Sequence, residues 1–190
     1  VHQHLDLIAG LPDEGYDSFG KSFCDVYQLR PQQLQLGFLK VLKGSFMYQA
    51  APEYGCVCQS REPYEVLYTR WLPYDDVLRL KLVEEMVEVY YNSNQFGKTL
   101  RAIEKLFDNP FALYEALGAF YDKKGYMDIS HTRIRRYEIL QEFLQEYVDE
   151  EQMDYYRQLM ICDLYARENV KTRPAWAKDL KAYKRDIREF

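Results

Sequence analysis

The sequence lacks the features that define disulfide-rich proteins and membrane proteins. Only four cysteines occur in 190 residues, and they are too few and too scattered for a disulfide framework, so we expect reduced thiols. No apolar run reaches the roughly 18 residues that a membrane-spanning helix needs, and no charged-then-apolar leader opens the chain. We therefore expect a cytoplasmic protein without a membrane partner.

Excess positive charge is also missing from the chain as a whole. The net charge is −5, which argues against a general nucleic-acid binder because phosphate binding needs clustered cations. The charge is uneven, since residues 171–190 hold seven basic and three acidic side chains. A solvated or internally paired helix face is the favoured interpretation of this basic segment, ahead of a nucleic-acid site.

Motifs for self-contained catalysis are absent as well. Three serines lack the glycines of a nucleophile elbow, and three histidines have no metal or triad spacing. Cys56 and Cys58 are separated by one residue, a poor spacing for a metal site, so ordinary loop thiols are favoured over a ligand pair and the role of the two cysteines stays open. The serines and histidines are Ser45, Ser60, Ser93, His2, His4 and His131.

What the chain does contain is typical of a folded, helix-rich protein. Hydrophobic residues make up 47% and charged residues 29%, as in ordinary globular domains, and the length allows one sizeable core or a small core with an appendage. Aromatic residues reach 16%, and 18 of them are tyrosines, which bury a ring while their hydroxyl stays hydrogen-bonded. This composition favours helix packing and names no function.

The first forty residues predict a strand, a helix and a second strand. Residues 5–11 are apolar around a single acid, Asp6, as in a parallel strand covered on both faces. Residues 16–29 have helical spacing that ends at Arg30-Pro31, and residues 34–39 form the next strand. Two parallel strands do not make a stable sheet alone, so we expect their partners in an N-terminal part of a longer protein.

The rest of the chain predicts an irregular connection followed by helices. Residues 43–73 contain three prolines and two glycines and little periodicity. A helix capped by Asp75 or Asp76 follows, and Asn109 and Ser130 are candidate caps for later helices. The later helices are expected at residues 98–107, 110–124, 132–148, 151–167 and 174–189.

Asp6 is the first candidate for a functional residue. Burying an acid in an apolar strand costs several kcal/mol unless it is paired. We expect Asp6 to face a ligand, a cation or a hydrogen-bonded terminus, and a structural role in holding a neighbouring loop carries about equal weight. The arginine-rich segment, residues 133–136, is explained as well by a solvated helix face as by anion binding. For the tyrosine-rich segment, residues 90–96, aromatic packing at a helix end is favoured over a substrate pocket or an interface.

The segments HLDLIAGLP at 4–12, LRP at 29–31, LQLGFL at 34–39 and KGS at 43–45 follow one another in this order along the chain. They resemble the later barrel strands of radical S-adenosylmethionine enzymes. The order and spacing are similar to those of oxygen-independent coproporphyrinogen oxidases and, more closely, of cobalamin-binding radical proteins with an uncharacterised helical C-terminal domain. The barrel resemblance covers about the first quarter of the chain. The closer match, to the cobalamin-binding proteins, includes QLGFLKVLKGS at 35–45 and PYEVL at 63–67.

The resemblance implies an iron-sulfur oxidoreductase as the parent protein. Such enzymes use a 4Fe-4S cluster, held by three cysteines spaced C-x-x-x-C-x-x-C, to cleave S-adenosylmethionine to a 5′-deoxyadenosyl radical, and some also bind cobalamin. That cysteine triplet is absent here, and none of Cys24, Cys56, Cys58 or Cys162 replaces it. We therefore expect the chain to be inactive alone and to need N-terminal cobalamin-binding and barrel regions as partners, with a small-molecule or macromolecular substrate that the sequence does not identify.

The resemblance also implies cofactor-binding positions. In the first strand Asp6 matches a polar contact to the adenosyl group, Ile8 an apolar contact and Gly10 a position of close approach. In the second strand Gln35, Gly37 and Phe38 match contacts to adenine. The competing explanation is that both strands are largely apolar only because they form the hydrophobic core of a barrel. No residue is predicted to be catalytic or to bind a metal.

Together these points predict a mainly α fold, a helical bundle-like domain preceded by a strand-helix-strand remnant of a parallel barrel. The expected divisions are 1–45 for the barrel strands, 46–73 for the connection and 74–190 for the helical domain. The expected function is to support cofactor or substrate binding in a radical S-adenosylmethionine enzyme. The alternative is a non-enzymatic helical module that docks a protein or RNA.

Overall fold

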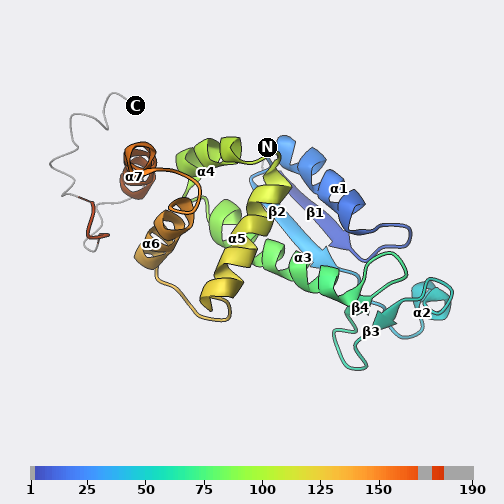
Figure 1. Cartoon of the computed structure of the whole chain (residues 1–190). Helices are drawn as coiled ribbons and strands as arrows, with labels where there is room; N and C mark the ends of the chain where they lie inside the picture. Colours follow the sequence, from blue (N-terminus) through green and yellow to red (C-terminus); the bar gives the residue numbers. More distant parts are fainter. Residues whose placement is uncertain (1–2, 167–172, 178–190) are drawn as a thin grey trace.

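The computed structural model describes residues 3–166 and 173–177, and α-helices dominate it (Figure 1), which confirms the mainly α prediction. Helices α6 (Arg133–Leu144) and α7 (Glu150–Tyr165) lie at one end of the molecule and residues 46–58 lie at the other, and two parallel strands with a crossover helix lie between them. The N-terminal elements are β1 (His4–Ala9), α1 (Tyr16–Gln28) and β2 (Gln33–Phe38). The predicted strand-helix-strand order is therefore confirmed.

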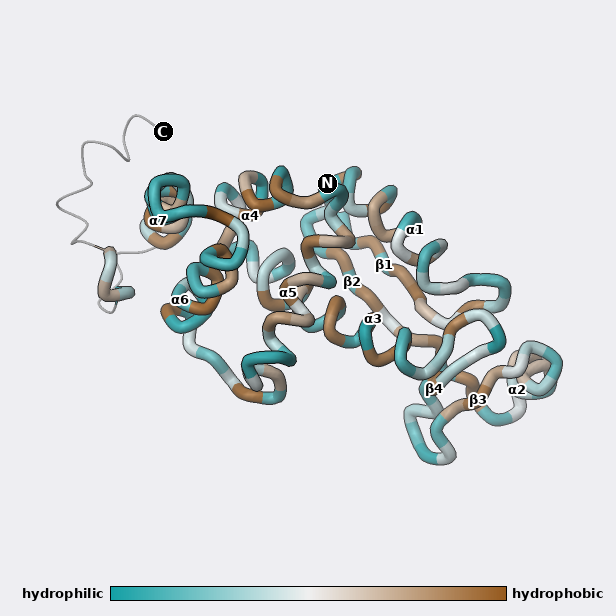
Figure 2. The backbone as a smooth tube through the Cα atoms, viewed as in Figure 1, coloured by the Kyte–Doolittle hydropathy of each residue, from teal (hydrophilic) through white to brown (hydrophobic). Residues whose placement is uncertain are grey.

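The two strands pair in parallel, with His4 beside Gln33 and Ala9 beside Phe38. One face of this sheet belongs to the hydrophobic core, where Leu34, Leu36 and Phe38 pack with side chains of α1 such as Phe23. Figure 2 shows hydrophobic segments along both strands and along α3 (Tyr74–Met86), which packs against β2.

The other face of the sheet is open. Along β1 the exposed residues alternate with less exposed ones, and Ile8 keeps 45% of its surface accessible. The prediction of a strand covered on both faces is therefore wrong for the described residues. The reason is that the helices contacting the strands, α1 and α3, lie with the core on one side of the sheet.

The predicted irregular connection contains short regular elements. They are α2 (Phe46–Ala50), β3 (Val57–Cys58) and β4 (Val66–Tyr68), and β3 pairs antiparallel with β4. We call residues 40–70 the arm. It lies beyond the carboxyl ends of β1 and β2 (Figure 1), where Val66 N donates to Leu39 O at 2.8 Å and Lys40 forms a bridge with Glu65.

The helical part follows the sequence prediction closely, with different caps at two positions. Asn109 caps α5 as expected, since its side chain accepts from Ala112 N at 2.9 Å. Thr132, not Ser130, caps α6, and Pro73 precedes α3, so that Asp75 and Asp76 lie in its first turn. The helices are α3 (Tyr74–Met86), α4 (Gly97–Ile103), α5 (Pro110–Lys124), α6 (Arg133–Leu144) and α7 (Glu150–Tyr165), with a π-helical turn η1 (Val87–Asn92) and a 3-10 turn η2 (Glu104–Leu106).

The π-helical turn η1 connects the helical part to the sheet. The side-chain amide of Asn92 accepts from Leu34 N and donates to Leu34 O, both at 2.9 Å. Tyr91 also donates to Pro31 O at 2.5 Å. Through these bonds the end of the α3–η1 helix is fixed to the beginning of β2.

The basic C-terminal segment and the helix predicted at 174–189 lie largely outside the described residues. Within the part that is described, residues 173–177, a turn forms in which Ala177 N donates to Pro174 O at 3.0 Å. Across the described ranges, no helix combines the length and the hydropathy needed to cross a bilayer.

The crossing of α3 and α5 depends on a glycine. A Cβ atom at Gly118 would lie 2.8 Å from Leu82 Cβ and 3.3 Å from Leu82 C, so the two helix backbones approach too closely for a side chain there. We expect Gly118→Ala to lower the free energy of unfolding by about 1–3 kcal/mol, as overpacking does in other cores. Chemical denaturation followed by circular dichroism measures this change.

The matched control is Gly97→Ala in α4. An added Cβ there meets nothing within 4 Å. Because alanine is a better helix former than glycine, this variant should be neutral or slightly more stable. Equal destabilisation by both substitutions would contradict the helix-crossing argument.

Candidate functional site

The open face of the β1–β2 sheet is the candidate site, because it gathers most of the residues predicted to bind a cofactor. Asp6 is opposite Gln35 and Ile8 is opposite Gly37 in the parallel register. Since residues i and i+2 of a strand point to the same side, these four residues share one face with His4. The sequence placed them on two strands, and the structure brings them together.

Polar contacts connect the two strands across this face. His4 Nε2 lies 3.0 Å from Asp6 Oδ1 and 3.2 Å from Gln35 Oε1. The Asp6 side chain keeps 65% of its surface exposed and that of His4 keeps 42%, so solvent screens the ion pair and its contribution to stability is small. Asp6 is thus held by a neighbour on its own strand, and the described contacts do not connect it to a loop.

The chemistry of the open face favours a ligand with hydrogen-bond donors and a flat or apolar part. The Asp6 carboxylate and the Gln35 amide oxygen can both accept hydrogen bonds from hydroxyl or amino groups. Ile8 lies next to them with exposed apolar surface. The Asp6 carboxylate repels anions, so the face is poorly suited to phosphate binding.

Two predicted site residues lie away from the open face. Phe38 is 6% exposed and packs in the core, with Lys81 Nζ 4.1 Å from its ring centroid, so only its backbone is available to a ligand on the open side. Gly10 is buried at the end of β1 with φ 89°. A Cβ there would lie 2.8 Å from Val66 Cγ1, so the close approach that Gly10 permits in this structure is to the arm.

Comparison with known protein families gives one match. Residues 52–190 match a family described as a protein of unknown function, DUF4080. The chain belongs to this family. A search of curated proteins found no match. The matched range begins inside the arm, so in this DUF4080 protein the open face of β1 and β2 precedes the family domain.

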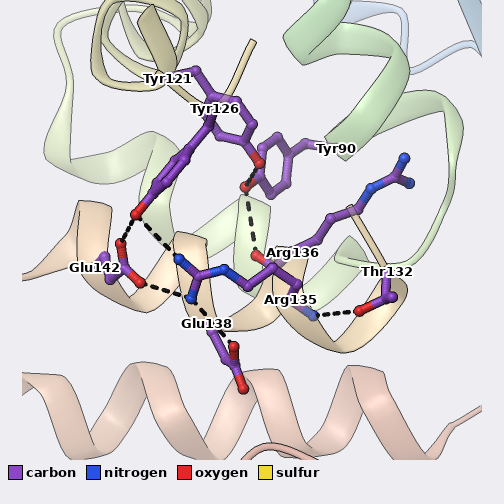
Figure 3. A network of polar contacts seen from close by, with 8 residues as sticks. All are labelled: Tyr90, Tyr121, Tyr126, Thr132, Arg135, Arg136, Glu138 and Glu142. Atoms are coloured by element: carbon purple, nitrogen blue, oxygen red, sulfur yellow. Dashed lines mark hydrogen bonds and ion pairs between the residues drawn. The ribbon is translucent and has the colours of Figure 1, made fainter. Parts of the chain in front are cut away.

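The arginine-rich helix α6 of the DUF4080 domain is internally paired. Arg135 Nη1 lies 3.2 Å from Glu138 Oε2 and 2.8 Å from Glu142 Oε1, and Arg135 Nη2 donates to Tyr126 Oη at 3.1 Å (Figure 3). The guanidinium charge is therefore balanced by two carboxylates. These contacts favour the helix-face explanation of Arg135 over anion binding, with the charge paired inside the protein.

Several tyrosines, in the DUF4080 domain and on α1, lie in the core. Tyr90 and Tyr121 share a hydrogen bond at 2.7 Å (Figure 3), and Tyr27 and Tyr114 share another at 3.2 Å. Burial raises the pKa of Tyr90 and of Tyr114 well above the ordinary value, so both hydroxyls stay protonated at neutral pH. For Tyr90 the packing interpretation of the tyrosine-rich segment is confirmed.

Other candidates from the sequence also have structural partners. His131 Nε2 contacts Tyr126 O at 2.9 Å, and the Ser45 hydroxyl accepts from Tyr48 N at the start of α2. Within the described residues no group of three or more His, Cys, Asp or Glu side chains is arranged to hold a metal ion. His2 lies outside the described residues.

Sequence reasoning missed the part of His4 in the site. The sequence shows no metal or triad spacing for His4, whereas the structure places its ring within 3.0 Å of Asp6 Oδ1 and 3.2 Å of Gln35 Oε1 on the open face. The alternation His4, Asp6, Ile8 along a single strand carried this signal, because a period of two places all three on one side. The assumption that both faces were buried concealed it.

Proposed function

We propose that this chain is the C-terminal part of a radical S-adenosylmethionine iron-sulfur oxidoreductase, in which the open sheet face supports binding of the cofactor. The observation that carries the proposal is the placement of Asp6, Ile8, Gln35 and Gly37 in register on one exposed face of two parallel strands. The opposite face of the same strands is covered by the core.

A parallel sheet with one open face is incomplete in physical terms. Parallel sheets occur with both faces covered, and two strands are too few for an independent sheet. In a parallel barrel the helices lie outside and the opposite face points inward. The helix-covered and open faces of β1 and β2 match this division, so the proposal assigns the open face to the interior of a barrel completed by N-terminal strands.

The residues of the open face fit an adenosyl group. Ribose hydroxyls and the adenine amino group are donors, and Asp6 and Gln35 offer acceptors next to the exposed side chain of Ile8. The four cysteines do not supply the cluster-binding triplet, which the proposal assigns to the N-terminal regions. When bound there, the cluster and S-adenosylmethionine supply the radical chemistry, and this chain positions the adenosyl group and excludes water.

The family match supports the same assignment. DUF4080 is a domain that sits C-terminal in radical S-adenosylmethionine and cobalamin proteins. The family domain packs against the sheet through η1 and α3, and the arm, in which the domain begins, lies at the carboxyl ends of the strands, the edge at which parallel barrels bind their substrates. We propose that the helical part acts there as a lid or a substrate-recognition element.

The test uses the longer protein that joins this chain to N-terminal cobalamin-binding and barrel regions, reconstituted with its cluster under anaerobic conditions. We expect Asp6→Ala to weaken S-adenosylmethionine binding by about tenfold or more, as loss of a hydrogen bond to a charged group does. Equilibrium binding and formation of 5′-deoxyadenosine are the two measurements.

Asp25→Ala is the matched control, because Asp25 is exposed on α1, outside the open face. It should leave both measurements unchanged. The proposal fails if the fully cluster-loaded protein never cleaves S-adenosylmethionine, or if Asp6→Ala binds as tightly as the control. Retention of a specific protein or RNA partner by the helical part in the absence of any such cleavage would favour the non-enzymatic module instead.

A further inference from the structure

The two cysteines of the arm form a close pair. Cys56 directly precedes Val57, and Cys58 ends β3, so the two side chains flank one strand residue. Their sulfur atoms lie 3.6 Å apart. The β3–β4 pairing has a register shift between Val57 and Cys58, and such an irregularity changes the direction of neighbouring side chains.

The pair is accessible from a cavity. Cys56 and Cys58 both line a cavity of about 510 Å³, together with Lys43, Tyr48 and Tyr64. Cys56 itself is 8% exposed, whereas Cys58 is half-buried. A small reagent can therefore approach the pair from this cavity.

Geometry favours a dithiol over a metal site. A disulfide bond is about 2.05 Å long, so the sulfurs must approach by roughly 1.5 Å, which side-chain rotation and a small backbone shift can provide. A structural zinc ion requires four ligands. In the described part of the chain, no third His, Cys, Asp or Glu joins the pair in such a group.

We propose that Cys56 and Cys58 form a reversible disulfide by exchange with a low-molecular-weight disulfide. One thiolate of the pair attacks the disulfide RSSR, a protein–SR mixed disulfide forms and one RS⁻ leaves. The second thiolate then attacks the protein sulfur of the mixed disulfide, the intramolecular bond forms and a second RS⁻ leaves. Two protein thiols are oxidised and one disulfide RSSR is reduced, and the two protons lost by the protein thiols convert the two RS⁻ groups to thiols.

The ionisation of Cys58 gives this site a characteristic pH dependence. Burial, and then the hydrogen bond and charge of Cys56, raise the pKa of the Cys58 thiol to about 12, although a backbone contact with Val41 opposes the shift. Below that pKa the thiolate fraction increases about tenfold per pH unit. We therefore expect the rate of the step in which Cys58 attacks to increase with pH throughout the neutral range.

The proposed Cys56–Cys58 disulfide is a property separate from cofactor binding, and it does not depend on the radical-enzyme proposal. The arm that carries the pair also carries Val66, which packs against Gly10 at the end of β1. Closing a disulfide beside β4 would restrain the arm at the carboxyl ends of the two strands. The chemistry can be tested on the chain alone, so its failure is distinct from a failure of the radical-enzyme proposal.

The experiment exposes the reduced full chain to mixtures of oxidised and reduced glutathione in graded ratios, followed by acid quenching, alkylation and trypsin digestion. Cleavage after Lys43 and Arg61 releases one peptide, residues 44–61, whose only cysteines are Cys56 and Cys58. We expect this peptide to lose two hydrogens and to escape alkylation as the oxidised fraction rises, at a rate that increases with pH.

Variants distinguish ring closure from simple thiol modification. Cys58→Ser should retain glutathione on Cys56 at a level about tenfold or more above that of the wild type, because no neighbouring thiol resolves the mixed disulfide. Cys24→Ser, which removes a distant thiol, should close as the wild type does. The proposal is overturned if the wild-type peptide stays fully alkylatable at every ratio, or if it accumulates as much glutathione adduct as Cys58→Ser.

Discussion

Replacing Asp163 with alanine should lower the free energy of unfolding by about 3–5 kcal/mol, because each buried donor that is left without an acceptor costs about 1–3 kcal/mol. Asp163 on α7 is 8% exposed. Its carboxylate accepts from Lys98 N at 3.0 Å, from Thr99 N at 2.9 Å and from the Thr99 hydroxyl at 2.7 Å. The Asp163 side chain thus supplies acceptors for the backbone N–H groups at the beginning of α4 and connects α4 to α7.

Urea denaturation followed by circular dichroism measures the change, and Asp154→Ala is the control on the same helix. The Asp154 side chain is 76% exposed and pairs with Arg157 at 3.0 Å, so its loss should cost less than about 1 kcal/mol. Asp163→Asn, which keeps one acceptor oxygen, should fall between the two. A loss at Asp163 no larger than at Asp154 would show that water replaces the carboxylate and that the α4–α7 link is weak.

Replacing Gly10 with alanine should destabilise the chain by about 2–4 kcal/mol, combining backbone strain with overpacking. Gly10 has φ 89°, a region that residues with a Cβ rarely adopt, and the new Cβ would lie 2.8 Å from Val66 Cγ1. Denaturation curves give the magnitude. The same variant should loosen the arm, which faster amide hydrogen exchange in β4 would report.

Gly44→Ala separates the two causes. Gly44 has φ 84° but a Cβ there meets nothing within 4 Å, so only the backbone strain of about 1–3 kcal/mol applies. Combining Gly10→Ala with Val66→Ala should relieve part of the overlap, so the double variant should be more stable than the sum of the two single effects predicts. If the effects of Gly10→Ala and Val66→Ala on stability simply add, Val66 is not the residue that the new Cβ at position 10 overlaps.

The elements with strong local signals were predictable from the sequence. Asn109 followed by Pro110 marks the beginning of α5, and the predicted range 110–124 agrees with the helix in the structure. The strands β3 and β4 were not predicted, because two or three residues are too few to show a period of two. Thr132 replaced Ser130 as a cap, since either residue type can fill that position and the chain path decides between them.

The candidate site was predictable in its residues and less so in its arrangement. The strand pattern around Asp6 pointed to β1, but the exposure of one face depends on which elements of the chain lie over it, which a local pattern does not encode. The partner of Gly10 could not be predicted for the same reason, because Val66 lies 56 residues further along the chain. The sequence shows Cys56 and Cys58 as neighbours, whereas their sulfur separation of 3.6 Å depends on the local irregularity of β3.

The bond pair between Asn92 and Leu34 has a consequence for how the sheet can be extended. The amide of Asn92 bonds both backbone groups of Leu34, as a neighbouring strand would, and thereby occupies the outer edge of β2 at its beginning. β1, in contrast, has β2 as its only strand neighbour among the described residues. Growth of the sheet is therefore directional: an added strand can join beside β1, whereas beside β2 the position at Leu34 is already taken.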